Sequence, residues 1–168
     1  MPPERRTQRE RLALRGALLR LTPPLETIAE DVLGVVSRID LVARDPDGAV
    51  TLVLVAQAGA DLARLAEGIA QSAWVAARIG DWNQLAPHLA LAAEQGARLL
   101  LVAPRFDDRT RAAVEALRGD GVRLAEQLPR GDLDVELRLL DRDPVSDLAQ
   151  PGVPSPRRES GFRSGLSD

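Results

Sequence analysis

Cysteine, lysine and tyrosine are all absent from this chain of 168 residues. Without cysteine, the chain has no disulfides, thiolate zinc sites or cysteine nucleophiles, and it is compatible with a reducing compartment. With only two tryptophans and two phenylalanines, we expect no base-stacking platform for single-stranded nucleic acid. No segment approaches the roughly 20 consecutive apolar residues that span a bilayer. We therefore expect a cytoplasmic protein with no membrane partner.

The 22 basic residues are all arginines. A bias in codon composition can replace surface lysines by arginines without functional consequence. A catalytic lysine should resist such replacement, because arginine does not lose its proton and presents a planar fork in place of a compact charge. The complete absence of lysine therefore argues against an active site that depends on an ammonium group.

The formal charge is −3 and the sequence pI is about 5.3, which argues against a broad basic surface for nucleic acid. The positive charge is concentrated near the amino terminus. A patch facing DNA or RNA phosphates would consist of Arg5, Arg6, Arg9, Arg11 and Arg15. The alternative is an amphipathic helix whose arginines simply face the solvent.

Hydrophobic periodicity and turn residues predict alternating helices and strands. A capping box of Thr7 and Glu10 begins a first helix, which extends to about Leu21 and is stopped by two prolines. Three strands follow at 26–33, 37–44 and 50–56, then a long helix at 60–78 and a helical run at 85–95 that ends at Gly96. The remaining elements are a strand at 97–103, a helix at 107–118, a strand at 122–127 and an edge strand at 134–140.

The composition changes sharply near residue 144. We expect residues 1–143 to form a single α/β domain. Residues 144–168 are rich in proline, serine, glycine and arginine, have no face to bury, and are predicted to be a disordered tail.

The hairpin at 38–57 and the order of elements carry a family resemblance. The hairpin reads Arg-Ile-Asp-Leu-Val-Ala-Arg-Asp-Pro-Asp-Gly before an apolar strand, and Leu-Leu-Leu-Val-Ala-Pro follows on a later strand. Over residues 7–128 the chain resembles the PD-(D/E)XK, restriction-endonuclease-like nuclease superfamily. The resemblance implies a mixed central sheet flanked by helices. It also implies a Mg²⁺ site built from an aspartate that begins one strand and an acid-x-lysine motif that ends the next.

Asp40 stands at the position of that aspartate, whereas the acid and lysine positions are read as Val55 and Gln57. Valine cannot bind a metal, and glutamine offers an amide without the ammonium charge. The hairpin places Asp40 opposite residues 53–55. Asp40 is then either a relic metal ligand or a carboxylate that is solvated or paired with Arg38 or Arg44.

Two further positions come from the same resemblance. Gln71 and Trp74 on the long helix correspond to a glutamine and an aromatic residue that related enzymes carry above the site, although Trp74 also suits the core. Glu10 corresponds to an acid on the first helix of some members, and its capping-box role is the alternative.

Three functions remain open from the sequence. The first is a catalytically inactive nuclease-fold protein, with no cofactor, that binds DNA or RNA or acts as a scaffold. The second is an active Mg²⁺-dependent nuclease whose site has migrated to Glu10, Asp40 and Asp45 or Asp47, although an Asp-Pro-Asp-Gly turn uses such residues for backbone reasons. The third is a protein-interaction module or homodimer that recruits its partner through Trp82 or the tail.

Overall fold

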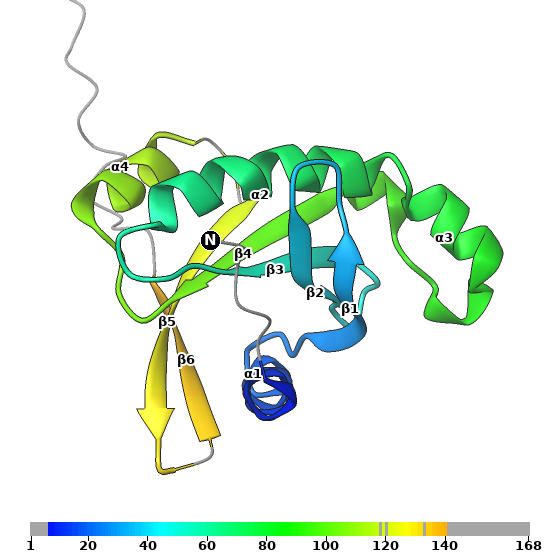
Figure 1. The fold of residues 1–168 in the computed structure, drawn as a ribbon. Coiled ribbons are helices and arrows are strands. Elements are labelled where there is room, and N and C mark those ends of the chain that lie inside the picture. The colour runs from blue at the N-terminus through cyan, green and yellow to red at the C-terminus, as the bar shows by residue number, and fades with distance from the viewer. Residues whose placement is uncertain (1–6, 118, 120, 133, 141–168) are drawn as a thin grey trace, which may run out of the picture.

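A computed structural model describes residues 7–117, 119, 121–132 and 134–140 (Figure 1). In these residues six strands form one sheet. The elements in chain order are α1 (Gln8–Leu19), β1 (Glu26–Leu33), β2 (Arg38–Arg44), β3 (Val50–Val55), α2 (Asp61–Ala76), α3 (Ile79–Leu85), β4 (Ala97–Ala103), α4 (Asp108–Ala116), β5 (Val122–Arg130) and β6 (Asp134–Leu140). The predicted tail at 144–168 lies outside the described residues.

The sheet is mixed, with its strands in the order β1-β2-β3-β4-β5-β6. β1, β2 and β3 form an antiparallel meander. β3, β4 and β5 are parallel, and β6 returns antiparallel to β5. This confirms the predicted mixed sheet flanked by helices, and the topology is consistent with a restriction-endonuclease-like fold.

Helices cover both faces of the sheet. α2 lies across one face and α1 lies across the other, while the hairpin of β5 and β6 projects beyond them (Figure 1). Every residue of β3 is buried, because its alternate side chains enter two different apolar clusters. Leu52 and Leu54 belong to the cluster beneath α2, whereas Val53 and Val55 belong to the cluster that contains Leu14 of α1.

Most predicted elements are confirmed within a few residues. The capping box at the start of α1 is present, since the side chain of Thr7 accepts a hydrogen bond from the Glu10 amide and that of Glu10 accepts one from the Thr7 amide. None of the described helices is both long and apolar enough to cross a membrane.

The helix predicted at 85–95 is wrong. The helical segment is instead α3, which ends at Leu85. Only two short 3₁₀ turns follow it, at Pro87–Leu89 and Ala93–Gln95. A proline disfavours helix in the residue before it, and Ala90 has a left-handed backbone with φ of 47°. The Asn83 side chain also bonds both the amide and the carbonyl of Leu91, which folds the chain back.

Gly68 sets the distance between α2 and the sheet. A Cβ atom at this position would lie 2.5 Å from one methyl of Leu99 and 3.0 Å from a methyl of Leu54. Both leucines are fully buried, so neither can move without repacking the cluster around it.

We predict opposite effects for two helical glycines. Gly68→Ala should destabilise the protein by roughly 1–3 kcal/mol through overpacking. Gly16→Ala in α1, where the new Cβ meets only Arg20 at 3.6 Å, should stabilise it by roughly 0.5–1 kcal/mol through helix propensity. Urea unfolding of both variants measures the difference, and an unchanged or stabilised Gly68→Ala variant would contradict the close packing.

Candidate functional site

Asp40 lies near the start of β2, beside the last residues of β3. Leu41 pairs with Val53, so Asp40 lies across from the end of β3, as the hairpin predicts. Its Oδ2 atom accepts hydrogen bonds from the Val55 amide at 2.9 Å and from Nη2 of Arg64 at 2.9 Å. One backbone amide and one guanidinium therefore bind this carboxylate oxygen, and the guanidinium belongs to a residue of α2 that the sequence did not indicate.

Arg64, in the first turns of α2, has its guanidinium enclosed by oxygen atoms. Besides Asp40, Nη2 donates to the carbonyl of Arg38 at 3.0 Å, while Nη1 donates to Oγ of Ser37 at 3.0 Å and to Oε2 of Glu67 at 2.6 Å. Ser37 in turn donates to the same Glu67 oxygen at 2.9 Å. We call Ser37, Asp40, Arg64 and Glu67 the Arg64 cluster.

The Arg64 cluster is largely removed from solvent. The side chains of Arg64, Asp40 and Glu67 are 19%, 24% and 35% exposed. Ion pairs at such depth are screened less than surface pairs, and removing one partner leaves a poorly solvated charge. Two carboxylates thus share one guanidinium at the place where the resemblance implies a metal ion, and one negative charge remains in excess.

The end of β3 lies beside Asp40, whose carboxylate accepts a hydrogen bond from the backbone amide of Val55. The side chain of Val55 itself packs in the cluster on the α1 face. Regular alternation does not assign Asp40 to either face, because Ile39 and Leu41, its neighbours along β2, belong to different clusters.

The end of β3 gives this site no metal ligand. The apolar side chains of Leu54, Val55 and Ala56 cannot coordinate a cation. Gln57 lies beyond the end of β3 and is exposed. Among the described residues at the end of β3, neither a second carboxylate nor an ammonium group is present to bind Mg²⁺ or stabilise a phosphate.

The carboxylates of the alternative, migrated site do not converge on Asp40. Glu10 is engaged in its capping box. Asp45 follows the opposite end of β2, roughly 16 Å along the strand at about 3.3 Å per residue. It is buried, and it accepts hydrogen bonds from the amides of Asp47 and Ala49 in the turn. In the part of the chain that the structure describes, no three acidic or histidine side chains are grouped to hold a metal ion.

Gln71 of α2 is fully buried and clamps the turn between β1 and β2. Its Oε1 atom accepts from the Val35 amide at 3.0 Å, and Nε2 donates to the Ser37 carbonyl at 2.5 Å. A Cβ atom on Gly34 would lie 2.1 Å from that Oε1 atom, so the turn requires glycine there. Gln71 thus fixes the segment that carries Ser37. Trp74 is half-buried against the core, with the guanidinium of Arg78 stacked 4.1 Å from its ring.

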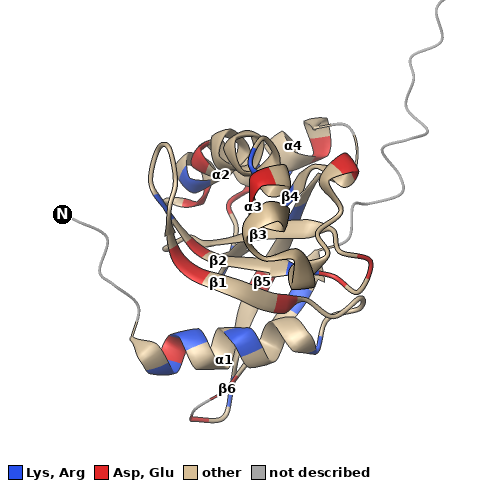
Figure 2. Ribbon diagram, turned by 90° about the vertical axis from the view of Figure 1, so that its right-hand side faces the viewer, with Lys and Arg blue, Asp and Glu red and all other residues tan. Residues whose placement is uncertain are grey.

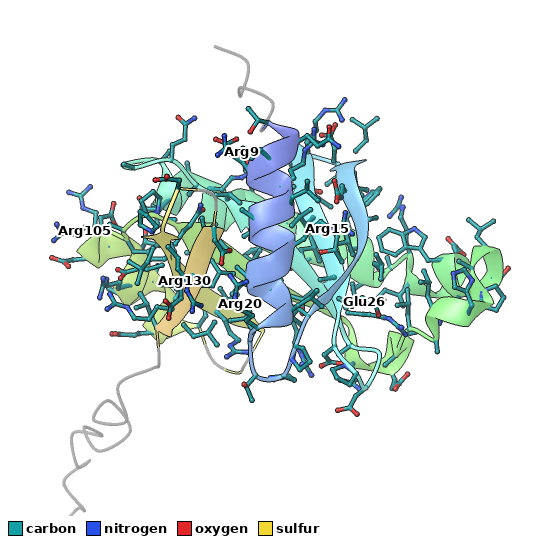
Figure 3. The ribbon with its side chains drawn as sticks, turned by 90° about the horizontal axis from the view of Figure 1, so that it is seen from below. Arg9, Arg15, Arg20, Glu26, Arg105 and Arg130 are labelled. Carbon is teal, nitrogen blue, oxygen red and sulfur yellow. The ribbon has the colours of Figure 1, made fainter. Side chains whose placement is uncertain are left out.

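The candidate arginine patch is only partly described, because Arg5 and Arg6 lie outside the described residues. α1 runs along the lower face of the molecule, as Figure 3 shows. Arg15 reaches Glu30 of β1 at 3.0 Å, and Arg9 donates to the Asp132 carbonyl at 3.5 Å. Within the described residues, the side chain of Arg11 has no hydrogen bond or ion pair recorded. Part of the positive charge of α1 is therefore offset by pairing with Glu30. The ribbon of α1 carries both basic and acidic positions (Figure 2).

A pocket of about 580 Å³ opens at the opposite end of the parallel strands. Arg98, Arg111 and Arg123 contribute to its lining. Arg98 is paired with Asp45 at 3.2 Å and Arg111 with Glu126 at 2.9 Å. Two of the three arginines in the lining are therefore already paired with carboxylates of the protein itself.

Asp61, the first residue of α2, is a buried carboxylate without a cationic partner recorded in the described residues. Its Oδ2 atom accepts a hydrogen bond from the Asp107 amide at 3.0 Å, which ties α4 to α2. Burial is the largest influence and opposes ionisation, but the Asp107 amide, the neighbouring Thr110 hydroxyl and its own amide favour the ionised form and together outweigh it, so its pKa is lowered. Neither the Thr110 hydroxyl nor Oδ1 of Asp61 makes a hydrogen bond of regular geometry.

We predict that Asp61 contributes to acid unfolding. A lowered folded-state pKa contributes stability that is present above the unfolded-state pKa of about 3.9 and is lost as the pH falls through the folded value. Asp61→Asn should therefore be less stable than the parent protein at pH 7, with the difference shrinking below about pH 4. Urea unfolding at a series of pH values measures this. A difference that stays constant from pH 7 to pH 2 would contradict the assignment.

Comparisons with known proteins add little to this geometry. No protein-family model matches the sequence, and no curated protein matches it significantly. Among solved structures, a repair endonuclease from Pyrococcus abyssi is similar at a TM-score of 0.48 and 14% identity, over 76% of this chain and 50% of that chain. The chain spans half the length of that endonuclease. At this identity and TM-score the likeness bears on neither the activity nor the ligands of this chain.

Proposed function

We propose that this protein is a non-catalytic relative of the PD-(D/E)XK nucleases that acts by binding, either to nucleic acid or as a scaffold. The observation that carries the proposal is the ion pair between Asp40 and Arg64. The guanidinium supplies Asp40 with the positive charge that a nuclease takes from a metal ion. Unlike a bound metal ion, it carries no water to activate as a nucleophile.

The residues present fit a divalent cation poorly. A Mg²⁺ ion favours octahedral oxygen coordination with one or two carboxylates and several waters. Asp40 and Glu67 could provide carboxylates, but both are bonded to the one guanidinium that lies between them. Binding a divalent cation there would require Arg64 to leave its four acceptors, and it would place the ion beside the guanidinium, so that three positive charges would share one half-buried site.

A cleavage assay tests the loss of catalysis. We expect the full chain, with Mg²⁺ or Mn²⁺ in the millimolar range, to cleave labelled single- and double-stranded DNA and RNA no faster than an Asp40→Ala variant purified in parallel. The variant is the control for contaminating nuclease. Metal-dependent cleavage that disappears in Asp40→Ala would show an active site and overturn the proposal.

The arginine patch on α1 carries the nucleic-acid branch of the proposal. Arg9 and Arg11 are the described members that are not held by a side-chain carboxylate recorded in the structure. Phosphate contacts of this kind give affinity that falls steeply with salt, with a slope near 0.9 per phosphate neutralised. We therefore expect binding only at low salt and without sequence preference.

A matched pair of double variants tests this patch. Arg9→Ala with Arg11→Ala should weaken retention of DNA or RNA in a mobility-shift assay and reduce the salt slope by about 2. Arg105→Ala with Arg109→Ala removes the same charge from exposed positions before and within α4 and should bind like the parent protein. Equal loss in both double variants would mean that net charge alone drives binding, and no retention of any nucleic acid would favour the scaffold.

A further inference from the structure

The outer face of α2 has an unusual composition for a solvent-exposed helix surface. Six of its positions are exposed, and each is occupied by an aliphatic residue: Leu62, Ala63, Ala66, Ile69, Ala70 and Ala73. Among the charged residues of α2, Asp61 is buried, and Arg64 and Glu67 are bonded to each other and only partly exposed. By comparison, the exposed positions of α1 include Arg9, Glu10 and Arg15.

The turn between β1 and β2 extends this apolar surface. Leu33, Val35 and Val36 are exposed, and with Leu62 and Ile69 they keep 40% to 68% of their surface in solvent. The turn lies directly beside α2, because Gln71 bonds both Val35 and Ser37, and Figure 1 shows it rising to the level of the helix. We call the outer face of α2 together with this turn the α2 surface.

We propose that the α2 surface is the contact through which two copies of this chain associate. The inference goes beyond the proposed function and does not depend on nucleic-acid binding. The absence of charge on the exposed positions of α2 favours such a contact. A two-fold contact brings identical patches together, so a charged patch would repel its own copy. The exposed positions of α2 carry no charge and avoid this repulsion.

The shape of the α2 surface is also suited to contact with a second copy. Leu62 and Ile69 are seven residues apart and project from one side of the helix, while the alanines leave shallow hollows beside them. The same helix therefore presents both the projecting side chains and the hollows that receive them. Two copies crossing about a two-fold axis can interlock in this way, as ridges fit into grooves between packed helices.

The area of the α2 surface sets the strength of the association. A helix of 16 residues is about 24 Å long and about 10 Å wide, which gives roughly 240 Å² of facing surface per copy before the turn is added. The helix faces of two copies bury on the order of 480 Å² in total, and the exposed side chains of the turn add to this. The contact is therefore below the size of a stable interface and in the range of weak association. The dimer is therefore in rapid, concentration-dependent exchange with the monomer.

Sedimentation velocity of the full chain from about 5 to 500 μM tests the association. The parent protein is expected to shift from monomer to dimer over this range. Ile69→Glu places a charge at the centre of the contact and should raise the dissociation constant at least tenfold. Leu85→Glu, at an 85% exposed position on α3 outside the α2 surface, should leave it unchanged. A parent protein that stays monomeric throughout, or a dimer that ignores Ile69→Glu, overturns the proposal.

Cross-linking provides a second readout that does not weaken the contact. Because the chain has no cysteine, Ala70→Cys introduces a single thiol near the middle of α2. Under mild oxidation it should form a covalent dimer several times faster than Leu12→Cys, which is exposed on α1. Equal rates for the two variants would mean that the contact is not made by α2.

Discussion

The guanidinium of Arg64 is the constraint around which this end of the protein is organised. It joins β2 to α2 through Asp40 and the Arg38 carbonyl, and it fixes Glu67 against Ser37. Gln71, two turns further along α2, clamps the same turn of chain. One side of the helix thus holds the strand ends by polar contacts made in a half-buried setting, where such bonds are strong and a missing partner is costly.

The two sides of α2 have different roles in the molecule: the inner side packs on the sheet, and the outer side faces solvent. Its inner side brings Gly68 against the leucines of the sheet and Arg64 against Asp40, which leaves Asp40 paired with a guanidinium. Its outer side carries only aliphatic residues at exposed positions. A rigid α/β domain can serve as a platform for partners whatever its chemistry, since function resides in the sites that a fold presents and not in the fold itself.

The sequence was sufficient for the order of elements, because strong periodicity, the capping box and the Asp-Pro-Asp-Gly turn are local signals. It could not place Arg64, since an Arg and a Glu three residues apart on a helix are typical of a solvated surface pair. The direction of the Asp40 side chain depends on a local irregularity of β2, where Ile39 and Leu41 enter different clusters, and the sequence carries no signal for it. The error at 85–95 arose because tertiary bonds from Asn83 override helix-forming composition.

The most direct test of the central claim is a double-mutant cycle of Asp40→Ala and Arg64→Ala, measured by urea unfolding with and without millimolar Mg²⁺. If Arg64 serves as the cation of Asp40, the coupling free energy should be about 1–3 kcal/mol and should not change with Mg²⁺. A coupling near zero, or a parent protein that Mg²⁺ stabilises through Asp40, would contradict the claim that the guanidinium occupies the metal position.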